Sequence, residues 1–160
     1  MIIIVMGVSG SGKTTIGRLL ANDLGWDFYD ADDFHSAQNI AKMSRGLALS
    51  DGDRQPWLKS LRVLILDCLK SGKQAVIACS ALKETYRIAL RVNDNVQFVY
   101  LKGSFEQIKA RLTDRQNHFM SGDLLADQFT TLEEPLDAVP IDISMQTDQI
   151  TQAIRIALDI

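Results

Sequence analysis

The sequence predicts an α/β fold in which helices pack on a parallel sheet. Short apolar runs alternate along the chain with longer segments that are apolar at helical spacing, and this alternation is typical of successive β-α-β units. The first apolar run leads directly into a glycine-rich loop, as expected of a buried first strand. The length of 160 residues and the 46% share of hydrophobic residues suit a single domain, residues 1–160, with one core.

The first half of the chain supplies two strands and two long helices. Ile2–Val5 is a β-branched run suited to a strand buried on both faces. Lys13–Leu24 places apolar residues on one helical face and stops at Gly25, a residue that often ends helices. Asp27–Asp30 is expected to be a short second strand, and Arg54–Ser71 an amphipathic helix.

The second half continues the alternation. Gln74–Cys79 and Val96–Leu101 are predicted strands, each preceded by turn residues. Phe105–Leu112 is expected to be a helix, Val139–Ile143 a last strand, and Gln149–Leu158 a closing helix. Ligands bind at the carboxyl ends of the strands in such sheets, so function is expected in the loops that follow the strands.

Composition excludes several classes of function. Lys and Arg number 17 against 20 Asp and Glu, and this net charge of −3 argues against general binding of nucleic acid. The longest apolar stretch, residues 1–6, is far shorter than the ~20 residues of a membrane span and lacks the features of a secretory signal. Cys68 and Cys79 stand in no metal or redox spacing, so we expect buried thiols in a cytoplasmic protein.

The strongest motif is a glycine-rich loop that matches the pattern G-x-x-x-x-G-K-[ST]. We expect its residues, with the following Thr15, to bind the phosphates of ATP: Gly7, Val8, Ser9, Gly10, Ser11, Gly12, Lys13 and Thr14. Glycines let successive N–H groups point at phosphate oxygens, Lys13 adds a mobile charge, and the Thr14 hydroxyl can ligate Mg²⁺. The alternative is a turn that binds nothing, but the motif follows a predicted strand and opens a predicted helix, as phosphate binding requires.

Two further observations favour phosphoryl transfer over other uses of such a loop. The chain has no Asn/Thr-Lys-x-Asp element of the kind that recognises guanine. The strand Gln74–Cys79 is followed by Ser80 and not by an acidic residue that could polarise water in a mechanical ATPase. Its sequence, Cys79-Ser80-Ala81-Leu82-Lys83, is better suited to an anionic substrate.

Two carboxylates follow the second strand, at Asp30 and Asp32. Phosphoryl transfer to an alcohol needs an acceptor for the hydroxyl proton and a partner for Mg²⁺. We assign Asp32 as the general base or hydroxyl-orienting group, and Asp30 as a support for Mg²⁺ through water. The alternative is an acidic turn or helix cap before Phe34.

A basic pair, Arg111 and Arg115, lies four residues apart on one predicted helical face. Sixteen of the 17 Lys and Arg residues fall within residues 1–115, so an anionic ligand must find its cationic contacts mostly there. The pair leads into a stretch without clear periodicity, which suits a lid over about residues 112–135. We expect both arginines to bind ATP and Arg115 to act in catalysis. The alternative is a solvated surface helix.

Several blocks of the sequence, in order, resemble the gluconokinases, small P-loop kinases related to the shikimate and nucleoside monophosphate kinases. The resemblance covers nearly the whole chain. Besides the phosphate loop, the matching blocks are Asp30-Ala31-Asp32-Asp33-Phe34-His35, Asn39-Ile40-Ala41-Lys42-Met43, Asp51-Gly52-Asp53-Arg54-Gln55-Pro56-Trp57-Leu58, Cys79-Ser80-Ala81-Leu82-Lys83 with Tyr86-Arg87, Tyr100-Leu101-Lys102-Gly103, and the lid from Arg111 to Pro135. The loop alone is shared by many enzymes, whereas the ordered set is far more specific.

The resemblance implies a P-loop kinase three-layer sandwich, with a five-stranded parallel sheet of order 2-3-1-4-5 and a mobile helical lid. It implies a homodimer that uses ATP and Mg²⁺ to phosphorylate D-gluconate at its 6-hydroxyl, giving 6-phosphogluconate. Gluconate is a polyol with a carboxylate, so its site needs cations and hydrogen-bonding groups. The expected substrate-binding residues are Asp32, His35, Arg54, Ser80, Lys83, Arg87 and His118. Trp57 is expected to anchor its helix beneath the site.

The sequence departs from the family pattern at Ser36, Ala48, Asn117 and Asp127. The first three affect loop geometry, whereas Asp127 adds negative charge to the predicted lid and is expected to weaken its closure over an anionic substrate. Two other functions stay open. One is a kinase for another small hydroxy acid, such as shikimate or a different aldonate. The other is an ATP-binding regulator without turnover, which would be expected to lack Lys13 or the paired carboxylates.

Overall fold

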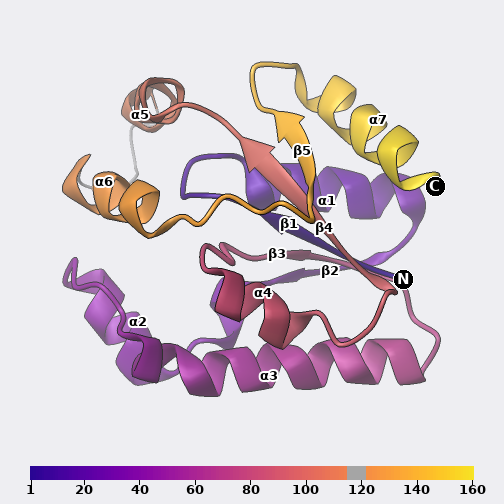
Figure 1. Ribbon diagram of the computed structural model, residues 1–160, viewed down its shortest axis with the longest axis horizontal. Coiled ribbons are helices and arrows are strands. Elements are labelled where there is room, and N and C mark those ends of the chain that lie inside the picture. Colours follow the sequence, from indigo (N-terminus) through magenta and orange to yellow (C-terminus); the bar gives the residue numbers. More distant parts are fainter. Residues whose placement is uncertain (115–121) are drawn as a thin grey trace.

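The computed structural model describes residues 1–114 and 122–160 (Figure 1). Within these residues five parallel strands form one sheet in the order β2-β3-β1-β4-β5. The strands are β1 (Ile2–Met6), β2 (Asp27–Asp30), β3 (Ala75–Ala78), β4 (Val96–Lys102) and β5 (Val139–Asp142). The predicted class and strand order are confirmed.

Helices cover both faces of the sheet. α3 (Asp51–Lys70) and α4 (Glu84–Leu90) lie on one face, and α1 (Lys13–Leu24) and α7 (Thr147–Leu158) lie on the other (Figure 1). Because β1 is the central strand, all five of its residues are buried. This position explains why its sequence is continuously apolar and does not alternate with polar residues.

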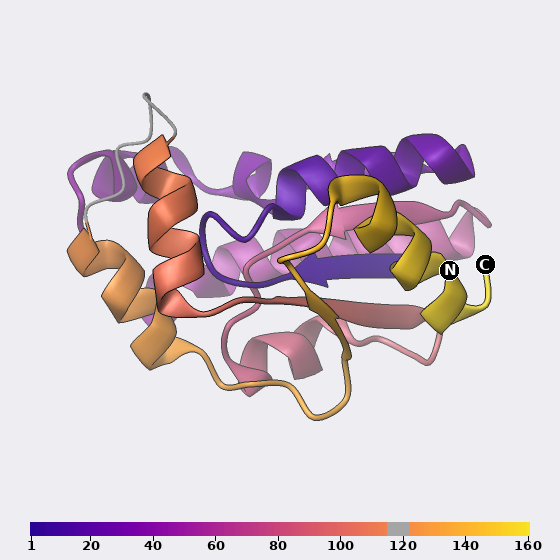
Figure 2. The same cartoon turned by 90° about the horizontal axis from the view of Figure 1, so that it is seen from above.

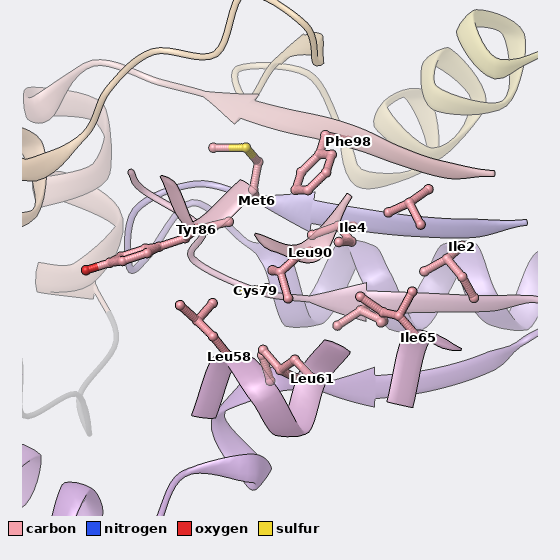
Figure 3. Close-up of a cluster of buried hydrophobic side chains, with 14 of the residues drawn as sticks. Ile2, Ile4, Met6, Leu58, Leu61, Ile65, Cys79, Tyr86, Leu90 and Phe98 are labelled. Carbon is pink, nitrogen blue, oxygen red and sulfur yellow. The ribbon is translucent and has the colours of Figure 1, made fainter. Parts of the chain in front are cut away.

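Successive side chains of β1 enter two different cores. Ile2, Ile4 and Met6 pack against α3 and α4, in the cluster drawn in Figure 3. Ile3 and Val5 pack against α1 and α7. The period-2 geometry of a strand thus divides one apolar run between both layers of helices.

The remaining helices gather beyond the carboxyl ends of the strands, away from both chain termini (Figures 1 and 2). They are the 3-10 helix η1 (Ala31–Phe34) and the α-helices α2 (Ala37–Ser44), α5 (Phe105–Asp114) and α6 (Gly122–Thr131). The predicted lid, about residues 112–135, includes α6 but also residues outside the described ranges. Arg115 and His118 lie among the latter, so their roles stay predictions.

The structure contains helices that periodicity did not reveal. α2 and α4 have only 8 and 7 residues, too few to show a clear helical period. Ser36, one of the departures from the family pattern, is the N-cap of α2, because its hydroxyl accepts a hydrogen bond from the Asn39 backbone N–H at 3.2 Å. This departure from the family pattern therefore serves as a helix cap.

The long helix α3 begins at Asp51, three residues before the predicted start. A capping box holds its first turn: the Ser50 hydroxyl accepts from the Asp53 backbone N–H, and the Asp53 carboxylate accepts from the Ser50 backbone N–H. Lys42 of α2 also donates to this carboxylate, at 2.8 Å. The Lys42 ammonium and the Ser50 groups together lower the pKa of Asp53 from 3.8 to about 2.

We expect the Asp53→Asn variant to be less stable than the wild type at neutral pH, by an amount that shrinks in acid. The pKa of Asp53 is lower in the folded state, so ionisation adds stability above the ordinary pKa of 3.8 that is lost as the pH falls through about 2. Urea-unfolding midpoints of both proteins, measured from neutral pH down to about pH 3, test this. A difference between them that does not change with pH would contradict the assignment.

The cysteines are placed as the sequence predicts. Cys68 and Cys79 are buried free thiols, and burial raises the pKa of both, that of Cys79 to about 12. Neither side chain is therefore a reactive thiolate at neutral pH. In the parts of the chain that the structure describes, no helix has both the length and the apolar character needed to cross a membrane.

Candidate active site

A cavity of about 460 Å³ opens at the carboxyl end of the sheet, between the phosphate loop, η1, α2, the start of α3, and α6. Six of the predicted site residues line it: Ser9, Lys13, Asp32, His35, Arg54 and Ser80. They come from segments up to 71 positions apart in the sequence (Ser9 to Ser80), which the parallel sheet brings to one edge. The volume is in the range of small-molecule sites.

The phosphate loop joins β1 to α1 with the backbone geometry that only glycine adopts easily. Gly10 and Gly12 have φ values of +81° and +101°. The Ser11 hydroxyl is buried, and it has no hydrogen-bond partner among the described residues. An unsatisfied buried hydroxyl is costly unless a ligand pairs with it, so this loop fits a ligand rich in oxygens, such as the phosphates of ATP.

Lys13 lies at the mouth of this loop. Its ammonium donates to the backbone carbonyl of Val8 at 3.0 Å. Burial lowers the pKa of Lys13, and the charges of Asp32 and Asp30 partly offset this. The next residues, Thr14 and Thr15, are exposed in the first turn of α1. The geometry keeps the side-chain nitrogen of Lys13 beside the loop before any phosphate arrives.

Asp30 caps the turn that follows β2, which is one of the two alternatives that the sequence left open, and its role toward Mg²⁺ stays a prediction. One carboxylate oxygen accepts from the Asp32 backbone N–H at 3.1 Å and caps η1, while the other accepts from the Thr14 hydroxyl at 2.9 Å. With its hydrogen given to Asp30, the Thr14 oxygen keeps lone pairs that can ligate a cation. The described residues contain no group of three or more His, Cys, Asp or Glu that could hold a metal alone. This pair therefore fits Mg²⁺ that arrives with phosphate oxygens.

Asp32 projects into the cavity with 82% of its side-chain surface accessible. The surrounding walls nevertheless displace bulk water and raise the pKa of Asp32, and the charge of Asp30 raises it further. Lys13 and His35 act in the opposite direction. A carboxylate with a raised pKa accepts a proton more readily than an ordinary one, which suits a general base.

His35 is held rigidly at the cavity wall. Its side chain is only 5% exposed, and its ring stacks on Trp57 at 4.7 Å between centroids and 10° between planes. Trp57 is itself buried and donates its indole N–H to the Ala31 carbonyl at 2.7 Å, so it supports the site from beneath as predicted. Burial lowers the pKa of His35; the charge of Asp32 partly offsets this shift and the charge of Arg54 reinforces it, so the surroundings favour the neutral ring.

Arg54 is the predicted substrate cation that reaches the cavity. Its guanidinium donates to the Leu49 carbonyl at 2.5 Å and to the Tyr86 hydroxyl at 3.5 Å. The Tyr86 ring packs at the end of the core, and its hydroxyl points away from the other labelled side chains (Figure 3) and donates to Asp51. Arg54 is thus oriented by hydrogen bonds to two segments of the chain, the loop before α3 and the helix α4.

Lys83 and Arg87 do not line the cavity. The Lys83 ammonium donates to both carboxylate oxygens of Asp51, at 2.8 and 2.9 Å. Arg87 is buried, and its guanidinium donates to the carbonyls of Ala81 and Leu82 at 3.1 and 3.0 Å. Ala81 has a positive φ of +43°, so Arg87 supports the unusual turn that follows Ser80. Direct contact of either cation with a substrate stays a prediction.

Arg111 also lies away from the cavity lining, in the last turn of α5. Its guanidinium donates to the backbone carbonyl of Ile143, just after β5. The contact holds the arginine against the loop between β5 and α7. Its predicted contact with ATP is not tested by this arrangement.

Sequence reasoning missed an apolar wall of the cavity. Met43, Leu47, Ala48 and Leu49 line it from the end of α2 and the following loop. Met43 and Leu47 are 39% and 52% exposed, although large apolar residues are usually covered. Exposed apolar residues at the rim of a cavity are typical of ligand sites. Their periodicity gave no signal because α2 is short.

α6 supplies the opposite wall, through Leu124, Asp127, Gln128 and Thr131. The Gln128 side-chain oxygen accepts from the Ser9 backbone N–H of the phosphate loop at 2.6 Å. Only Asp127 was singled out by the sequence, as an added negative charge, and the structure places it on the cavity wall. The expected weakening of closure over an anionic substrate remains a prediction.

Comparisons with known proteins agree with this arrangement. A family model described as shikimate kinase matches residues 9–150. A mouse protein described as a probable gluconokinase is 43% identical over 178 aligned positions, which cover 98% of this chain and 97% of that protein. The crystal structure of a sugar kinase from a Janibacter species has a TM-score of 0.92 at 44% identity, covering 99% of this chain and 94% of that chain. A gluconokinase structure from Sinorhizobium meliloti has a TM-score of 0.86 at 38% identity, covering 98% and 93%.

Proposed function

Because the chain belongs to the gluconokinase family within the shikimate kinase-like P-loop kinases, we propose that it transfers a phosphoryl group from ATP to the 6-hydroxyl of D-gluconate. The observation that carries this proposal is one cavity in which Lys13, Asp32 and Arg54 meet. These residues supply a cation for the transferring phosphate, an acceptor for the hydroxyl proton and a cation for a carboxylate. The cation for a carboxylate, Arg54, is what favours a sugar acid over a neutral sugar as the substrate.

The reaction follows from these roles. The 6-hydroxyl oxygen forms a bond to the γ-phosphorus, the bond from that phosphorus to the β–γ bridging oxygen breaks, and ADP leaves with the electron pair. Asp32 takes the hydroxyl proton, and Lys13 with the N–H groups of the phosphate loop stabilises charge on the phosphate oxygens. Thr14 and Asp30 would hold Mg²⁺, which supplies further neutralisation of phosphate charge when bound.

Recognition of gluconate needs one strong anionic contact and several weaker polar ones. Arg54 can pair with the carboxylate, since a planar guanidinium suits that geometry. His35 and Ser80 line the same cavity and can bond to hydroxyls of the polyol chain. The apolar wall of Met43 and Leu47 can cover the carbon skeleton.

Arg54→Met is expected to raise the KM for gluconate by about tenfold or more, because a hydrogen bond to a charged group is lost. Lys83→Met is expected to raise it less, since Lys83 is engaged by Asp51 and does not line the cavity. The KM for ATP should change little in both variants. Steady-state kinetics with each substrate varied in turn provide the measurement. A larger effect of Lys83→Met than of Arg54→Met would indicate that the gluconate carboxylate binds Lys83.

An ADP-release assay with Mg²⁺-ATP tests the function itself. The acceptors are gluconate, shikimate, glucose and AMP, with a reaction lacking any acceptor as the control. Turnover with gluconate alone is expected. Turnover with shikimate instead would reject gluconate as the substrate. Shikimate is included because the matching family model is described as shikimate kinase. ADP release without an acceptor, or no release at all, would reject the kinase activity.

We also propose that the protein is a homodimer, as the family resemblance implies. Sedimentation equilibrium distinguishes a particle of 17.8 kDa from one of twice that mass. A concentration-independent monomer would reject this part of the proposal and leave the reaction unaffected.

A further inference from the structure

Asn39 is a buried polar residue close to the site, although it does not line the cavity. It lies in α2 and is only 4% exposed. Its side-chain nitrogen donates to the backbone carbonyl of Asp53 at 2.7 Å. The same nitrogen lies 3.5 Å from Nδ1 of His35. Asn39 therefore connects the start of α3 with the histidine at the cavity wall.

These contacts fix which atoms of Asn39 and His35 carry hydrogen. A backbone carbonyl only accepts hydrogen bonds, so the atom of the Asn39 amide that faces the Asp53 carbonyl must be the nitrogen and not the oxygen. An amide nitrogen offers hydrogens and cannot accept one, so Nδ1 of His35 must be the acceptor. A neutral imidazole has a single N–H, and it must then be on Nε2.

The other side of the ring shows what this tautomer does. Nε2 of His35 lies 4.0 Å from a carboxylate oxygen of Asp32, and stacking on Trp57 keeps the ring in that orientation. An N–H directed toward the carboxylate is attractive, whereas a nitrogen lone pair there would be repulsive. Second contacts of this kind commonly set the tautomer of a functional histidine.

We propose that Asn39 is a positioning residue that holds His35 as the Nε2–H tautomer, so that the ring carries an N–H and not a lone pair on the nitrogen nearer Asp32, where it can donate to the substrate hydroxyl. As a donor, Nε2 cannot take the hydroxyl proton, and that step is left to Asp32. The catalytic part of this inference rests on the proposed function, but the tautomer does not.

Nitrogen-15 NMR of the imidazole rings tests the tautomer directly, because protonated and unprotonated ring nitrogens resonate well apart. The chain has only two histidines, and a His118→Gln variant identifies the signals of His35. We expect His35 to show a protonated Nε2 and an unprotonated Nδ1 at neutral pH. A protonated Nδ1 in the wild-type protein would overturn the inference, whatever substrate the enzyme uses.

Asn39→Asp tests the consequence, because a carboxylate of the same shape accepts from Nδ1 instead of donating to it. We expect the His35 proton to appear on Nδ1 and kcat with gluconate to fall by about tenfold or more, with the KM for ATP nearly unchanged. Ser36→Ala is the matched control, since it removes the N-cap of α2 and leaves the Asn39 side chain in place. It should keep both the Nε2–H tautomer and kcat.

The two variants separate positioning from simple loss of helix stability. Equal losses of kcat in Asn39→Asp and Ser36→Ala would overturn the positioning role. An unchanged kcat in a folded Asn39→Asp protein whose tautomer has switched would also overturn it. Lack of gluconate turnover in the wild type would reject the proposed function alone, because the spectrum is recorded without substrate.

Discussion

Replacing Lys13 with alanine is expected to lower kcat by about a hundredfold to a thousandfold, the range for loss of a group that stabilises charge in a transition state. The ammonium sits over the phosphate loop, bonded to the Val8 carbonyl, and can follow the charge that develops on the transferring group. The fold should persist, because the core on that side of β1 is built from apolar residues that the substitution leaves untouched. ADP-release kinetics and a circular dichroism melt on the same preparation give both results.

Lys73→Ala is the appropriate control for this variant. Lys73 is an exposed lysine whose ammonium lies 3.7 Å from a carboxylate oxygen of Asp27, at the amino end of β2 and far from the cavity lining. It should retain wild-type turnover. Wild-type turnover in a folded Lys13→Ala protein would contradict the role given to Lys13.

The sequence was sufficient to predict the elements that depend on local pattern. The continuous apolar run of β1, the helix from Lys13 to Leu24 and the strand Asp27–Asp30 appear in the structure as expected. Each has a strong local cause: burial on both faces, a one-sided apolar stripe, or a glycine that ends a helix. The phosphate loop was equally easy to predict, because the residues of its motif are consecutive in the sequence.

The partners of the charged side chains could not be predicted in this way. Lys83 looked like a substrate cation, yet Asp51, 32 positions away, holds it through two hydrogen bonds. Arg87 is buried beside the turn after Ser80, a position that depends on the short helix α4, which periodicity did not show. Contacts of this kind depend on how helices meet in three dimensions, and residue type alone does not specify them.

Asp30 shows why structural and functional interpretations need not exclude each other. The sequence offered either a magnesium support or a cap for the following turn; one carboxylate oxygen makes the cap, while the other accepts from the Thr14 hydroxyl, where the predicted Mg²⁺ would bind. The oxygen bonded to the Asp32 backbone fixes the turn that carries Asp32 into the cavity. The cap therefore positions the residue to which the proton transfer is assigned.

Replacing Asp32 with asparagine is expected to lower kcat by about a hundredfold to ten-thousandfold, the usual contribution of a positioned general base. The amide has nearly the same shape but cannot accept the hydroxyl proton, so binding of both substrates should be less affected than turnover. Asp33→Asn is the matched control. It removes a carboxylate from the same 3-10 helix, but Asp33 is exposed and does not line the cavity.

Comparing Asp32→Asn with Asp33→Asn decides whether any negative charge in this turn supports turnover, or whether the carboxylate must lie in the cavity. If negative charge near the phosphates were the only contribution, the two variants would lose similar amounts of activity. If Asp32 takes the proton, Asp32→Asn should lose kcat while Asp33→Asn stays close to the wild type. Near-normal turnover in Asp32→Asn would transfer the role of acceptor to another group at the cavity, and neutral His35 could fill it only if its Nε2 carried no proton.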